Sequence, residues 1–292
     1  GEVVSTGVSL GDAGSNAVVD SLFQENEFYD VATNAVYNWP PSTRNTFVRN
    51  YCNAGGTVYQ TVFGPNGACI IASGSSSLLI NNISEQATSG QGSSGWFDSS
   101  GNRFLGNISH NEQYALVIKG SDLTTALDHT IENNVCVQSG TRPTIAADRW
   151  GPCFLFRASR ENGNVEFVIR NNTALGSATS SGDDVPYGGF HADFEVPSIG
   201  RIIRMENNLA YNFTPDSRGS GFYVDSYNTY TNDYPGVFNN ALNFSAIGGS
   251  TITNINTSNP SQQSCPVFIP SASPLKNAGL GGKDIGANVL YA

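Results

Sequence analysis

The sequence predicts an all-β fold, a parallel β-helix solenoid of roughly 8–10 coils. Three observations support this prediction: a composition poor in charge, a repeat centred on asparagine, and short alternation of apolar and polar residues within the repeats. Charged residues make up 13% of the 292 residues, and 32 residues are glycine. Such a composition favours many short strands joined by tight turns over helices, which prefer Glu, Lys, Arg and Ala.

The repeat consists of an apolar pair, one or two small or polar residues, an asparagine and usually another apolar residue. Its clear copies are 79–83, 104–108, 131–135, 168–172, 205–209 and 237–241, with weaker copies at 23–27 and 47–51. The anchoring residues, 24 to 38 positions apart, are Asn26, Asn50, Asn82, Asn107, Asn134, Asn172, Asn208 and Asn240. One solenoid coil takes 20–45 residues, and longer coils loop out. Because asparagine tolerates a left-handed bend and can bond to its neighbour in a stack, we expect one asparagine column.

This pattern resembles the right-handed parallel β-helix superfamily, whose members include pectate-lyase-like enzymes, phage tailspikes and bacterial surface proteins. The segments 273–279 and 284–288 also look like the closing segment of many secreted bacterial members. The resemblance covers roughly residues 16–292. It implies one single-stranded right-handed β-helix over 1–292, with a partial first coil at 1–20 and a closing segment at 260–292. It implies no particular activity, because function lies in sites grafted on a fold.

Four of the five cysteines fall in two pairs with the same separation of 17 residues, Cys52 with Cys69 and Cys136 with Cys153. Equal spacing in a repeat protein predicts two equivalent disulfides, with buried thiols as the alternative. Cys265 would be left over. Disulfides indicate an oxidising compartment, so we expect a secreted or cell-surface protein. A chain that begins with Gly1 fits a processed protein with further sequence upstream.

Charge and hydropathy exclude some classes of function. The net charge of −10 argues against a nucleic-acid partner, because phosphate binding needs clustered Lys and Arg. No run of about 18 apolar residues is present, so we expect no membrane span. No cofactor is expected, although Asp183 and Asp184 beside Gly182 leave open a calcium loop or a solvated turn.

A second regularity concerns charge. The residues 15 positions before four of the anchoring asparagines are Lys119, Arg157, Asp193 and Asp225. Each follows a stretch in which apolar and other side chains alternate, as in Leu116 to Lys119. We therefore expect the four charges to stack on one outer face of the solenoid.

A functional interpretation makes this face a substrate groove for a polysaccharide. Asp193 and Asp225 would lie close enough to act as the paired carboxylates of glycoside hydrolysis, in which crowding raises one pKa. Lys119 and Arg157 would neutralise a uronate or take part in β-elimination. His191 is a further acid–base candidate. The expected substrate-binding residues are Tyr223, Tyr227 and Glu195. In terms of the resemblance, basic pairs serve some β-helix lyases and aspartate clusters serve β-helix hydrolases.

A structural interpretation of the same charges stays open. Stacked Lys, Arg, Asp and Asp side chains can form an ion-pair ladder that contributes only to solubility and edge protection. The sequence therefore leaves two function classes. The first is an extracellular polysaccharide lyase or glycoside hydrolase, with the insertions around 138–150 and 177–189 as groove walls. The second is a non-catalytic surface, adhesive or filament-forming scaffold of undetermined oligomeric state.

Overall fold

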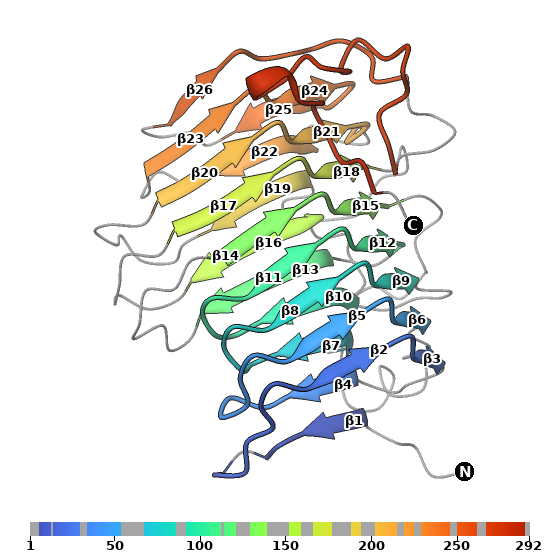
Figure 1. Cartoon of the computed structure of the whole chain (residues 1–292). Coiled ribbons are helices and arrows are strands. Elements are labelled where there is room, and N and C mark those ends of the chain that lie inside the picture. Colours follow the sequence, from blue (N-terminus) through green and yellow to red (C-terminus); the bar gives the residue numbers. More distant parts are fainter. Residues whose placement is uncertain are drawn as a thin grey trace.

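The chain forms a parallel β-helix, as its repeat predicts (Figure 1). Each coil adds one short strand to each of three sheets, and every paired strand is parallel to its neighbour in the next coil. The structure is a computed structural model that describes residues 6–12, 14–29, 34–53, 67–85, 92–111, 114–120, 129–138, 152–158, 166–176, 188–193, 202–214, 219–224, 229–245, 250–261 and 267–289.

The three sheets follow one another in every coil. The first sheet contains β1 (Thr6–Leu10), β4 (Asn34–Asn38), β7 (Gly67–Ala72), β10 (Gly92–Phe97), β13 (Tyr114–Gly120), β16 (Phe154–Ala158), β19 (Gly188–Asp193), β22 (Ser220–Val224) and β25 (Leu242–Ser245). The second sheet contains β2 (Leu22–Gln24), β5 (Thr46–Val48), β8 (Leu78–Ile80), β11 (Arg103–Leu105), β14 (His129–Glu132), β17 (Glu166–Arg170), β20 (Ile202–Glu206), β23 (Thr229–Asp233) and β26 (Thr251–Thr253). The third sheet contains β3 (Glu27–Tyr29), β6 (Tyr51–Asn53), β9 (Ile83–Glu85), β12 (Ile108–His110), β15 (Val135–Val137), β18 (Thr173–Leu175), β21 (Leu209–Tyr211) and β24 (Gly236–Phe238). A short 3-10 helix, η1 (Leu280–Gly282), lies in the C-terminal segment.

A column of asparagines marks the bend between the second and third sheets. Its members are Asn26, Asn50, Asn82, Asn107, Asn134, Asn172 and Asn208. In each step the backbone N–H and the side-chain Nδ2 of one asparagine both donate to Oδ1 of the asparagine in the next coil, at 2.9–3.1 Å. All but Asn26, at the open end, are buried. Because unsatisfied buried amides are costly, this ladder holds neighbouring coils in one register.

The prediction that Asn240 continues this column is wrong. Strand β24 pairs with β21 in a register that places Pro235, not Asn240, in the position after Asn208. Asn240 lies at the following bend, where its Oδ1 accepts from the backbone N–H of Phe213 and its Nδ2 donates to the carbonyl of Ala210. The string Val-Phe-Asn-Asn at 237–240 imitates the repeat, but it ends a strand of the third sheet rather than of the second.

The interior is filled by side chains that stack along the solenoid axis. One ring stack runs through four neighbouring coils, with centroid separations of 4.9, 4.9 and 5.6 Å, and contains Phe154, Phe190, Phe222 and Phe244. A second places His129 between Phe97 and Phe167, at 5.9 and 5.4 Å. His129 is fully buried, and this burial lowers the pKa of its imidazole to about 4. The ring is therefore a neutral core side chain at pH 7.

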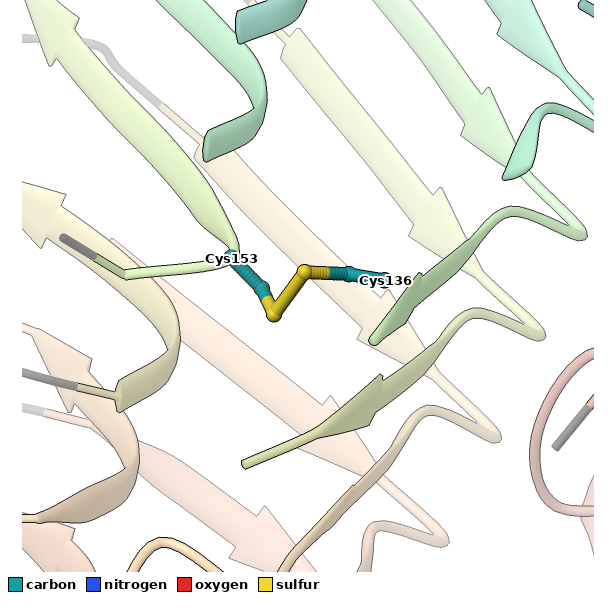
Figure 2. Close-up of a disulfide and its surroundings, with 2 residues drawn as sticks. All are labelled: Cys136 and Cys153. Atoms are coloured by element: carbon teal, nitrogen blue, oxygen red, sulfur yellow. A yellow bond between two sulfur atoms is a disulfide. The ribbon is translucent and has the colours of Figure 1, made fainter. Parts of the chain in front are cut away.

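One of the two predicted disulfides is present. Cys136 and Cys153 are bonded, with their Cα atoms 5.8 Å apart (Figure 2). Cys136 belongs to β15 and Cys153 directly precedes β16, so the bond ties the third sheet to the first across a bend. The prediction of a second bond is not met, because Cys52 and Cys69 are buried thiols. A spacing of 17 residues fixes the length of chain between two cysteines but not the directions of their Cβ atoms, on which a disulfide depends.

The C-terminal segment, residues 267–289, runs back along the outer face of the third sheet beside β21, β18 and β15 (Figure 1). It is tied there by hydrogen bonds. Asn171 Nδ2 donates to the carbonyl of Asp284 at 2.9 Å, and Thr173 Oγ1 accepts from the N–H of Ala287 at 2.8 Å. Between these points Gly286 has a φ of 108°, which only glycine adopts without strain.

Apolar side chains of the same segment cover the sheet beneath it. Leu275 and Ile285 pack with residues of β21, and Ala287 and Val289 pack with residues of β15. The described residues 267–289 thus cover this side of the later coils. Within the described residues no helix is long and apolar enough to cross a membrane.

Candidate functional site

The strands of the first sheet alternate as the sequence predicts. Their inward residues belong to the main core and include Leu116, Ile118, Phe154, Phe156, Phe190, Ala192, Phe222 and Val224. The outward residues fall in one register line, which we call the outer column. It consists of Ser9, Tyr37, Ile71, Trp96, Val117, Leu155, His191, Tyr223 and Ser245. The sheet therefore presents one line of side chains along the whole solenoid.

The predicted charges lie two residues further along these strands. The register pairs Lys119 with Arg157, and Arg157 with Asp193, so these three backbone positions stack in neighbouring coils. Their side chains lie outside the described part of the chain. Asp225 also lies outside it, as do Glu195 and Tyr227.

His191 and Tyr223 come together in the outer column. They are register partners on β19 and β22, and their ring centroids are 4.2 Å apart. His191 is only 5% exposed although it points away from the core, while Tyr223 is half-buried. A histidine that is almost fully buried and packed against a tyrosine ring has a restricted ring orientation. A general acid or base needs such an orientation.

Asp98 is a charged residue of this face that the sequence reasoning missed. It directly follows Phe97, whose register partner is Ile118, so it lies in line with Lys119. Asp98 accepts hydrogen bonds from Trp96 Nε1 at 2.5 Å and from Ser73 Oγ at 2.9 Å. It precedes Asn107 by only nine residues, because its coil has a shorter connection between the first two sheets. A search at a constant offset of 15 therefore passes over it.

Aromatic side chains at the N-terminal end of the face were missed as well. Tyr37 lies in the outer column, Trp39 lies two residues later, and their ring centroids are 4.4 Å apart. Trp39 Nε1 donates to Ser9 Oγ at 2.9 Å. Tyr37, Trp39 and Trp96 are all half-buried. A signal was present in the sequence, because a strand-like stretch with an outward aromatic residue precedes Asn50 and Asn107. Tyr37 and Trp96 lie at different distances from these asparagines, so a search at one constant offset does not find both.

The face combines two chemical zones. Its first coils carry half-exposed aromatic rings beside a carboxylate, a combination that binds sugar rings by stacking and hydrogen bonding. Its later coils carry a covered histidine, a tyrosine and the register line of Lys119, Arg157 and Asp193. In the described ranges no three His, Cys, Asp or Glu side chains converge on a point that could hold a metal ion. The expected calcium loop at 182–184 lies outside those ranges.

Comparison of the chain with protein-family models, with curated proteins and with solved structures finds no match. The case for a function therefore depends on the geometry of this face.

Proposed function

We propose that the protein binds and cleaves an extracellular polysaccharide along the outer face of the first sheet. The observation that carries the proposal is the register of this face: aromatic rings in the first coils continue into a line of ionisable residues in the later coils. A linear polymer lying along the solenoid axis would meet both zones. Successive strands are about 4.8 Å apart, so each coil offers a new contact at roughly the repeat of a chain of sugar rings.

The aromatic zone would hold the polymer and the ionisable zone would act on it. Asp193 lies in the same register line as Arg157 and two residues after His191, which contacts Tyr223. A carboxylate beside a second carboxylate, Asp225, would serve glycoside hydrolysis. Basic residues Lys119 and Arg157 beside a histidine would serve elimination from a uronate, in which a base removes the proton next to the carboxylate. The backbones of Lys119, Arg157 and Asp193 belong to paired strands of the first sheet, and such a ladder would hold them in place before the substrate binds.

The test is turnover of a panel of polysaccharides, measured as new reducing ends and as absorbance of the unsaturated uronate that only elimination produces. We expect Asp193→Asn and Asp225→Asn to abolish turnover with little change in melting temperature. Glu166→Gln, which removes a half-buried carboxylate on the second sheet, is the matched control and keeps full activity. Full activity in both aspartate variants would refute the assignment, as would an inert wild-type protein.

A specific observation favours the scaffold as the second candidate. Cross-coil ion pairs recur elsewhere on the surface, between Arg170 and Glu132 at 2.9 Å and between Arg204 and Glu166 at 2.6 Å. Surface pairs of this kind contribute little energy and serve solubility. If Lys119, Arg157 and Asp193 form one more such ladder, no polysaccharide in the panel will bind, and Trp39→Ala will have no effect on any glycan.

A further inference from the structure

The outer face of the third sheet carries a second group of side chains that the proposed function does not use. In β3, β6, β9 and β12 the middle residues point to the core, and the flanking residues point outward. The outward residues include Glu27, Tyr29, Tyr51, Asn53, Glu85 and His110, which we call the tyrosine–glutamate patch. The strand register brings them together from four consecutive coils.

Two tyrosine rings form the centre of the patch. The ring centroids of Tyr29 and Tyr51 are 5.6 Å apart, with the planes tilted by 53°. Tyr29 Oη donates to Glu27 Oε2 at 3.0 Å, and Tyr51 Oη donates to Glu85 Oε2 at 3.1 Å. Asn53 Nδ2 donates to Tyr51 Oη at 3.4 Å. Each ring is thus oriented by a carboxylate that accepts from its hydroxyl.

The patch is open to solvent. Tyr29 is 58% exposed, and the side chain of Glu85 is 42% exposed. His110 Nδ1 lies 3.1 Å from Glu85 Oε1 and is the described basic partner within the patch. The nearest arginine along the chain, Arg49, is engaged by Glu25 at the preceding bend. Two carboxylates beside two tyrosines therefore leave the patch with an acidic, aromatic surface.

This chemistry selects the charge of a ligand. A cation over an aromatic face is attracted by the ring quadrupole, and the neighbouring carboxylates add to that attraction. An anionic polymer such as a polyuronate would be repelled by the same two carboxylates. We propose that the tyrosine–glutamate patch binds an oligomer of amino sugars, with protonated amines of different sugar units at Glu27 and Glu85 and sugar rings against Tyr29 and Tyr51. This site lies on a different sheet from the proposed substrate face and is independent of it.

The experiment compares oligomers of pyranose sugars that differ in charge, two of which share the same ring. Glucosamine oligomers, fully N-acetylated oligomers of the same length and oligogalacturonates are titrated into the full chain at a pH where the amines are protonated. We expect binding of the glucosamine oligomer alone, weakened at high salt because exposed charges are screened. Equal binding of the acetylated oligomer, or no binding of either, would overturn the proposal.

Variants locate the binding. Tyr29→Ala and Glu85→Gln should each weaken the glucosamine oligomer about three- to fivefold, the range of one exposed cation–π or ion-pair contact. Glu166→Gln, on the second sheet, removes a half-buried carboxylate outside the patch and should leave the affinity unchanged. Asp98→Asn, on the first sheet, should also leave it unchanged, which separates this site from the proposed substrate face. Unaltered affinity in both patch variants would contradict the assignment.

Discussion

The outer face of the third sheet differs between the early and the late coils, although the backbone is the same. One register line carries Tyr29, Asn53, Glu85 and His110 in the early coils and then Val137, Leu175, Tyr211 and Phe238 in the late ones. The change from polar to apolar falls at β15, the strand against which Ala287 and Val289 pack, the last described apolar residues of the C-terminal segment. Strand geometry thus directs this residue outward in every coil, whereas its polar or apolar character follows the covering by the C-terminal segment.

Removing the contact between the segment and the late coils should have the largest effect. Ile285 is fully buried against β21, so Ile285→Ala deletes apolar contacts and leaves a cavity. We expect a loss of about 2–5 kcal/mol in the free energy of unfolding, measured by denaturant titration. Leu280→Ala changes a partly exposed residue of the same segment and serves as the control, with a far smaller loss. Similar losses in the two variants would show that the segment is not a structural cover.

Acid should test whether the early and late coils unfold together, because His129 lies in the first of the late coils and its ring stacks on Phe97 of the last early coil. The unfolded chain takes up a proton at this imidazole near pH 6.5, whereas burial lowers the folded pKa to about 4. Above pH 6.5, the neutral ring makes its full contribution to the free energy of unfolding. This contribution falls as the pH drops towards 4, by about 3 kcal/mol in all. In His129→Phe, which keeps the ring stack, this part of the pH dependence should disappear.

The measurement is the free energy of unfolding at several pH values, followed by fluorescence and by circular dichroism. Other groups also titrate in this range, so the informative quantity is the difference between wild type and His129→Phe. A difference that stays constant between pH 7 and pH 4 would contradict a buried neutral histidine. Two separate transitions would show that the two groups of coils unfold independently.

We expect the smallest effects from exchanging the residue types of two register partners, one in an early coil and one in a late coil. His110 and Val137 are register partners on β12 and β15. Val137→His places a polar ring beneath the C-terminal segment and should cost about 1–3 kcal/mol, because its nitrogens lose water. His110→Val should change stability by less than about 0.5 kcal/mol, since the side chain is partly exposed and its contact with Glu85 is at the surface. Thermal melts of both variants check this, and equal losses would refute it.

Much of the fold could be predicted from the repeat alone. The asparagines from Asn50 to Asn208 occupy one column because each coil bends at the same point, between the second and third sheets. Each bend must satisfy the same buried amide groups. The prediction failed at Asn240, where a similar string belongs to another bend. A short string of residues does not state which sheet it ends, and only the pairing of β24 with β21 decides this.

The candidate site was less accessible to sequence reasoning. Counting back from the asparagines aligned Lys119, Arg157 and Asp193, because their coils have connections of equal length between the first two sheets. It missed Asp98 and Trp96, whose coil has a shorter connection. Residues at a constant offset from their asparagines are neighbours in space only where the connections between the first two sheets have the same length in each coil.

The amino-acid sequence by itself determined the parallel β-helix, the asparagine column and the inward alternation of the first sheet. Each of these depends on contacts that recur in every coil and are therefore written repeatedly along the chain. The tertiary structure alone decided that Cys136 and Cys153 are bonded while Cys52 and Cys69 are not. It also decided that the C-terminal segment covers the late coils, and that Tyr29, Tyr51 and Glu85 meet on the early ones. These contacts join residues of different coils or bends once only, so no periodic signal in the sequence records them.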